Sequence, residues 1–123
     1  MKRGSIYLAA QDPGYASQRG GEPGTPFAEQ ALRPVVLVSR DAINRVSLVV
    51  LICPLVDAAS MRQLYPSDVA VRAPEGGLTA DSIVLTGQLR ALARTQLVRQ
   101  LGELSQEVMR QLDRALRITL DLD

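Results

Sequence analysis

Short apolar segments, separated by polar or Gly/Pro-rich stretches, fill the first three quarters of the chain. Residues 3–10 and 68–73 alternate apolar and polar positions, which is typical of half-exposed strands. Residues 33–39 form an unbroken apolar run, which indicates a strand buried on both faces. Residues 47–55 form another continuous run, rich in β-branched side chains. The predicted strands are 3–10, 33–39, 47–55 (closed by Pro54), 68–73 and 82–86, the last continued by 89–92. The pattern also predicts a turn at 40–44, a loop at 57–67 and a second turn at 74–77.

The apolar period changes in the last third of the chain. Residues 95–101 are predicted to form one or two helical turns, which Gly102 stops. A final helix is predicted over 106–120, with Ser105 as its N-cap. One face of this helix is apolar, and it carries Val108, Leu112, Ala115, Leu116 and Thr119. Five strands followed by helices predict a small antiparallel barrel or strongly curved sheet, closed by a C-terminal helix.

Residues 11–31 interrupt this pattern as one long irregular segment. They hold Gly14, Gly20, Gly21 and Gly24 together with Pro13, Pro23 and Pro26, and they show no periodicity. A compact domain rarely keeps so long a loop unless it is functional or mobile, and both readings stay open. We expect 14–27 to be poorly ordered without a ligand. Residues 1–123 are otherwise the length of a single domain.

Charge and composition exclude several kinds of site. Fourteen basic residues against thirteen acidic ones give a net charge of +1, so any site for a polyanion must be local. The chain has no histidine, which excludes a His-based triad and a His-ligated metal. Its one cysteine, Cys53, lies in an apolar run and is predicted to be a small buried side chain rather than a nucleophile. We therefore expect no metal site.

The same composition bears on size, location and assembly. No apolar stretch reaches the roughly 18 residues that a membrane helix needs. Residues 1–5 are not followed by the apolar segment of a secretory signal, so a cytoplasmic protein without a membrane partner is expected. A sheet of short strands buries little surface by itself, which favours a homodimer.

Candidate chemistry concentrates where the long loop enters the second predicted strand. Arg33 stands at the start of that strand, after Glu29 and Gln30. The end of the third strand, 55–57, is expected beside it, because the second and third strands pair through the segment 40–46. An arginine held by a rigid strand can stabilise negative charge that develops on a phosphate.

Short motifs stand along nearly the whole chain: RGSIY at 3–7, Asp12-Pro13, AEQ at 28–30, RPVV at 33–36, SRDAINR at 39–45, YPSDV at 65–69, GLTADSIV at 77–84, QLRAL at 88–92 and ALRITL at 115–120. In this order they resemble the MazF/PemK toxins of bacterial toxin–antitoxin modules. Each motif is short, and the specificity lies in their ordered occurrence.

The resemblance implies a dimeric, SH3-like antiparallel β-barrel with a C-terminal helix. It implies a hydrolase that cleaves single-stranded RNA at selected sequences, independently of the ribosome and without a metal or other cofactor. The ribose 2′-hydroxyl would be the nucleophile, and the products would carry a cyclic phosphate and a 5′-hydroxyl. The implied partners are messenger RNA and a MazE-like antitoxin whose disordered tail covers the RNA groove.

Individual residues carry this resemblance unequally. Arg33 matches the catalytic arginine of the family, and Glu29 and Gln30 match a mobile loop beside the scissile site. Gln88 matches a glutamine near the RNA path, and Arg90 matches a neighbouring arginine. Phe27 is a further candidate for RNA binding, by stacking on a base, and packing of Phe27 on the barrel is the alternative.

The chain also departs from the family pattern. Val56 stands where the family usually has a catalytic threonine, and valine can neither donate nor accept a hydrogen bond. Gly87 replaces a usual acidic residue, and the loop before Glu29 is longer than usual.

These departures leave three readings. The protein is a nuclease in which Asp57 or Ser60 takes the missing role, or a protein of the same fold that acts by binding antitoxin or RNA with little cleavage. A gyrase-poisoning toxin like CcdB is the third reading, which the motifs favour least.

Overall fold

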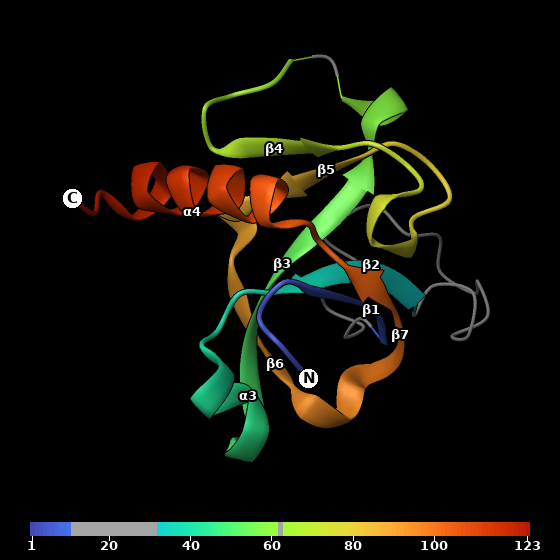
Figure 1. Ribbon diagram of the computed structural model, residues 1–123, viewed down its shortest axis with the longest axis vertical. Helices are drawn as coiled ribbons and strands as arrows, with labels where there is room; N and C mark the ends of the chain where they lie inside the picture. Colours follow the sequence, from blue (N-terminus) through green and yellow to red (C-terminus); the bar gives the residue numbers. More distant parts are fainter. Residues whose placement is uncertain (11–31, 62) are drawn as a thin grey trace, which may run out of the picture.

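The computed structural model describes residues 1–10, 32–61 and 63–123 (Figure 1). Within these ranges the chain forms seven strands and two α-helices. The strands are β1 (Ser5–Ala10), β2 (Leu32–Leu37), β3 (Val49–Asp57), β4 (Asp68–Val71), β5 (Ser82–Leu85), β6 (Arg90–Ala93) and β7 (Leu97–Glu103). The helices are α3 (Asp41–Val46) and α4 (Gln106–Leu120). The expectations for the long loop 11–31 lie outside the described residues.

The strands form one antiparallel arrangement with β3 at its centre. Their order is β4-β5-β3-β2-β1-β7, and β6 also pairs with β3. The long strand β3 changes partner along its length, since Val49 to Ile52 pair with β6 and Leu55 to Asp57 pair with β5. Figure 1 shows β3 running diagonally through the molecule, with α3 beside its beginning and β5 beside its end.

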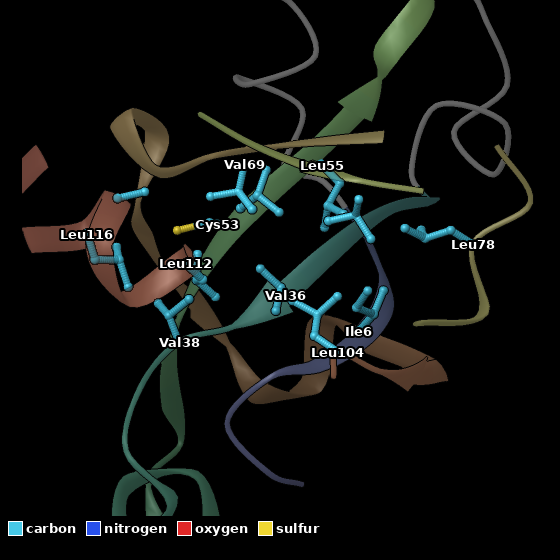
Figure 2. Close-up of a cluster of buried hydrophobic side chains, with 13 residues drawn as sticks. Ile6, Val36, Val38, Cys53, Leu55, Val69, Leu78, Leu104, Leu112 and Leu116 are labelled. Carbon is cyan, nitrogen blue, oxygen red and sulfur yellow. The ribbon is translucent and has the colours of Figure 1, made fainter. Parts of the chain in front are cut away.

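The C-terminal helix α4 covers one face of this arrangement, as its apolar pattern predicts. Leu112, Ala115 and Leu116 are buried in a cluster with core side chains of the strands, including Val36 and Cys53. Figure 2 shows Leu112 and Leu116 reaching from the helix toward Cys53. The Val108 N–H donates to the Ser105 hydroxyl at 3.2 Å, so Ser105 is the predicted N-cap. Among the described residues, no helix is long and apolar enough to cross a membrane.

A second buried cluster lies on the other side of the sheet. Its members are Ala9, Val35, Leu37, Val50, Ile52 and Leu92. Because side chains alternate along a strand, Val35 and Leu37 face this cluster while Val36 faces α4. The second predicted strand is therefore buried on both faces, as its continuous apolar run indicates.

The predicted helical turns at 95–101 are wrong. A single 3₁₀ turn, Arg94–Gln96, leads into strand β7, which pairs with β1 from Ser5↔Glu103 to Ala9↔Leu97. Gly102 does not stop a helix but lies within the strand, where a Cβ would come within 2.6 Å of the Gly76 carbonyl carbon. The open edge of β1 supplies hydrogen bonds to this segment, and such long-range pairing overrides a weak local helical pattern.

Three further boundaries differ from the predictions. The turn at 40–44 is the helix α3, in which Asn44 is buried and its side-chain amide donates to the Ser39 carbonyl at 2.8 Å. Residues 89–92 do not continue β5, because the 3₁₀ turn Thr86–Gln88 redirects the chain into β6. Strand β3 runs past Pro54 to Asp57. Pro54 lies between the residues of β3 that pair with β6 and those that pair with β5, so its missing N–H costs no hydrogen bond to either of these strands.

Candidate active site

A hollow of about 500 Å³ opens where β2 begins and β3 ends. The hollow is lined by Leu8, Arg33, Pro34, Leu55, Val56, Asp57, Gly77, Leu78, Thr79, Ala80, Ser82, Arg99 and Leu101. Most of its surface is apolar, and its charged members among the described residues are two arginines and one aspartate. Such a combination of an apolar wall with a few charged groups is typical of ligand-binding sites.

Arg33 is an exposed residue near the start of β2 and lies opposite Ala9 of β1. Two residues further along β2, Val35 lies opposite Pro54 of β3. Val56 follows Pro54 by two residues and lines the same hollow as Arg33. The fold therefore places the predicted catalytic arginine in the same hollow as the position where the family pattern has threonine.

Asp57 ends β3 at the rim of the same hollow. Its carboxylate accepts a hydrogen bond from the Ala59 N–H at 2.9 Å and so caps the 3₁₀ turn Ala58–Ser60. The Ser60 hydroxyl donates to the Asp57 carbonyl oxygen at 2.7 Å, and Ser60 is not among the residues that line the hollow. Of the two residues considered for the missing role, Asp57 lines the hollow together with Arg33.

Part of the lining of the hollow is formed by 77–80, which begin with the last residue of the 3₁₀ turn Glu75–Gly77. Gly77 has a φ of 77°, and a Cβ there would overlap the Leu101 carbonyl oxygen of β7. Only glycine combines this backbone conformation with so close an approach. Leu78 then inserts into the core, and Figure 2 shows it at one end of the buried cluster, on the side where Leu55 lies. This part of the lining is thus fixed by the packing of the turn on β7.

Sequence reasoning missed Arg99 and Thr79 as site residues. Arg99 lies on β7 opposite Leu8, and the helical interpretation of 95–101 hid this placement. Thr79 is an exposed hydroxyl in the part of the lining formed by 77–80. Gly102 was the available signal for β7, because a glycine inside a strand often marks a close approach of another backbone.

The remaining candidates lie away from the hollow or outside the described residues. Gln88 is half-buried in the 3₁₀ turn Thr86–Gln88, and Arg90 begins β6 opposite Ile52. Neither of them is among the residues that line the hollow. Phe27, Glu29 and Gln30 lie outside the described residues, so their roles in RNA binding stay predictions.

Cys53 is fully buried, as the sequence predicts. Desolvation by burial raises the pKa of its thiol from 9.0 to about 12, although the charge of Arg3 acts in the opposite direction. The thiolate, which is the reactive form, is therefore absent at neutral pH. Cys53 is a core residue, not a nucleophile.

Comparison with known proteins agrees with the motifs. Residues 2–120 match the profile of the family described as "PemK-like, MazF-like toxin of type II toxin-antitoxin system". The chain is 31% identical to the endoribonuclease MazF of Staphylococcus epidermidis, over 100% of this chain and 93% of that protein.

Solved structures share the fold. An endoribonuclease in complex with its cognate antitoxin, from a mycobacterial species, superimposes with a TM-score of 0.74 at 25% identity, over 100% of this chain and 97% of that one. MazF from Deinococcus radiodurans superimposes with a TM-score of 0.70 at 24% identity, over 99% and 97% of the two chains. Together with the profile match over nearly every residue, these similarities establish that the chain belongs to the PemK-like, MazF-like toxins of type II toxin–antitoxin systems.

Proposed function

We propose that the protein is an endoribonuclease that cleaves single-stranded RNA at selected sequences without a metal or other cofactor. The observation that carries the proposal is that Arg33 and Asp57 line one hollow from adjacent strands. A guanidinium can stabilise the charge that develops on the phosphate, and a carboxylate can accept the proton of the attacking hydroxyl. The similarity to an endoribonuclease over the whole chain supports the same activity.

In the proposed reaction the ribose 2′-hydroxyl attacks the adjacent phosphorus. Asp57 accepts the 2′ proton while the new O2′–P bond forms. Arg33 holds two phosphate oxygens and stabilises the charge of the pentacoordinate transition state. The P–O5′ bond breaks, the leaving 5′ oxygen takes up a proton from water, and the products are a cyclic 2′,3′-phosphate and a 5′-hydroxyl.

Val56 motivates a second candidate function. Because its side chain replaces a hydroxyl that the family pattern places in the site, the protein could keep the fold and the RNA contact without cleavage. In that case it acts by binding its antitoxin or RNA.

The proposed partners are a MazE-like antitoxin and a second copy of the chain, in the cytoplasm. A mycobacterial relative is described in complex with its cognate antitoxin. The homodimer is supported by exposed apolar side chains that we call the α3–β3 surface, from α3 and the beginning of β3. The α3–β3 surface consists of Ile43, Val46, Leu48, Val49 and Leu51. Val46 and Leu48 are 81% and 83% exposed, and monomeric proteins rarely leave such a group uncovered.

Induction in a bacterial host tests the function directly. We expect the wild type to arrest growth and fragment messenger RNA, and we expect Arg33→Ala to do neither at equal protein level. Arg33→Lys should rescue poorly, because a point charge cannot hold two phosphate oxygens in a fixed geometry. Growth arrest by both the wild type and Arg33→Ala, without RNA fragments, would support the binding-only candidate.

A further inference from the structure

The hollow contains a second arginine for which the proposed reaction has no role. Arg99 lies on β7 opposite Leu8 of β1, and Arg33 lies on β2 opposite Ala9 of the same strand. The two arginines therefore flank β1, with backbones about 10 Å apart, which is roughly two strand spacings. Both line the hollow.

Neither arginine is neutralised by a neighbouring carboxylate of the described residues. The ion pairs found there join Lys2 to Glu103 and Arg3 to Asp113, and they leave Arg33 and Arg99 without an acidic partner. Among the described residues that line the hollow, Asp57 is the only acidic one. Two positive charges against one negative charge make the hollow locally cationic in a protein of net charge +1.

Arg99 is also placed on a rigid support. β7 pairs with β1 on one side, and Gly77 and Gly102 bring the turn Glu75–Gly77 against its backbone. A guanidinium on such a strand loses less freedom on binding than one on a loop, and it matches the oxygens of a phosphate.

We propose that Arg99 binds an RNA phosphate next to the scissile phosphate held by Arg33. The proposal rests on the proposed function, because it takes RNA as the ligand that Arg99 binds in the same hollow. Two arginines on opposite sides of β1, with backbones about two strand spacings apart, suit successive phosphates of an extended single strand. Arg99 is thus a substrate-positioning residue that fixes where the backbone lies, not a residue that reads bases.

Binding of an uncleavable RNA tests this proposal without relying on cleavage. The probe is a randomised pool of short single-stranded RNAs with 2′-methoxy riboses, titrated at several salt concentrations. For a single strand, each phosphate contact contributes about 0.7 to the slope of log K against log salt. We expect Arg99→Gln to reduce that slope by about 0.7 and to weaken binding at low salt by about tenfold. Arg99→Lys should keep most of the slope.

Arg114→Gln is the matched control. It removes the same charge from an exposed position of α4, whose residues do not line the hollow. We expect this variant to bind with the wild-type slope, and both variants to keep the wild-type melting temperature because both side chains are exposed.

The outcomes separate this proposal from the proposed function. Equal slopes and affinities for Arg99→Gln and Arg114→Gln would overturn the role of Arg99, even if the wild type cleaves RNA. A reduced slope for Arg99→Gln alone supports that role, even if the wild type fails to cleave and the nuclease function falls. Absence of RNA binding by the wild type would overturn both.

Discussion

The Cys53 thiol illustrates how burial fixes the chemistry of one residue. Its pKa is raised to about 12 in the folded protein, so the unfolded chain gives up the thiol proton at lower pH than the folded one. The contribution of the thiol to stability is therefore complete below about pH 9 and is lost as the pH rises toward 12.

This shift predicts a steeper loss of stability at alkaline pH in the wild type than in Cys53→Ala. The free energy of unfolding, measured by urea titration from pH 8 upward, should fall faster in the wild type by up to about 1.4 kcal/mol per pH unit. Cys53→Ala removes only the thiol, so the difference between the two curves isolates it. Parallel curves would show that the thiol does not titrate differently in the two states.

The missing hydroxyl at Val56 predicts a specific order among three variants. Asp57→Asn keeps an oxygen that can cap the turn Ala58–Ser60 but loses the proton acceptor, so we expect a loss of cleavage rate of about 10² or more. Ser60→Ala should have a small effect, because its hydroxyl donates to the Asp57 carbonyl. Val56→Thr should change the rate only a few-fold, because Asp57 already supplies the acceptor.

Single-turnover cleavage of a mixed RNA pool ranks these variants. A large gain for Val56→Thr together with a neutral Asp57→Asn would assign the missing role to a hydroxyl at position 56 instead. A severe loss of cleavage rate for Ser60→Ala would assign the role of the missing threonine to the Ser60 hydroxyl.

At the scale of elements, strands with clear periodicity were predictable and those that depend on distant partners were not. Strands β1 to β5 and helix α4 follow from their apolar patterns, and the N-cap of α4 follows from Ser105. β7 has no comparable pattern, and its strand conformation comes from the open edge of β1 far away in the sequence. The site reflects this difference, since Arg33 lay on a predicted strand whereas Arg99 lay on a segment predicted as helix.

The change of partner along β3 was unpredictable for a related reason. Pro54 reads as the end of a strand, because proline lacks the N–H of a ladder bond. In the fold Pro54 lies between the part of β3 that pairs with β6 and the part that pairs with β5, and β3 continues to Asp57. Val56 and Asp57, which line the hollow, therefore belong to β3, although the predicted strand ended at Leu55 and the predicted loop began at Asp57.

At the scale of the whole molecule, the α3–β3 surface predicts self-association. Leu48→Asp places a charge where apolar contact is expected, so it should convert a wild-type dimer at micromolar concentration into a monomer. Leu64→Asp, also at an exposed leucine but in the segment before β4, is the control and should remain dimeric. Sedimentation velocity distinguishes the two states. A monomeric wild type, or a dimeric Leu48→Asp protein, would contradict the assignment of this surface.

Metal-independent cleavage of RNA through Arg33 is the central claim for the molecule. The most direct test is incubation of a mixed RNA pool with the purified protein in excess EDTA, followed by sequencing of the 5′-hydroxyl ends. We predict discrete cleavage sites with 5′-hydroxyl ends for the wild type and a rate about 10²–10³ lower for Arg33→Ala. An RNA pool left intact by the wild type, or cut equally well by Arg33→Ala, would contradict the claim.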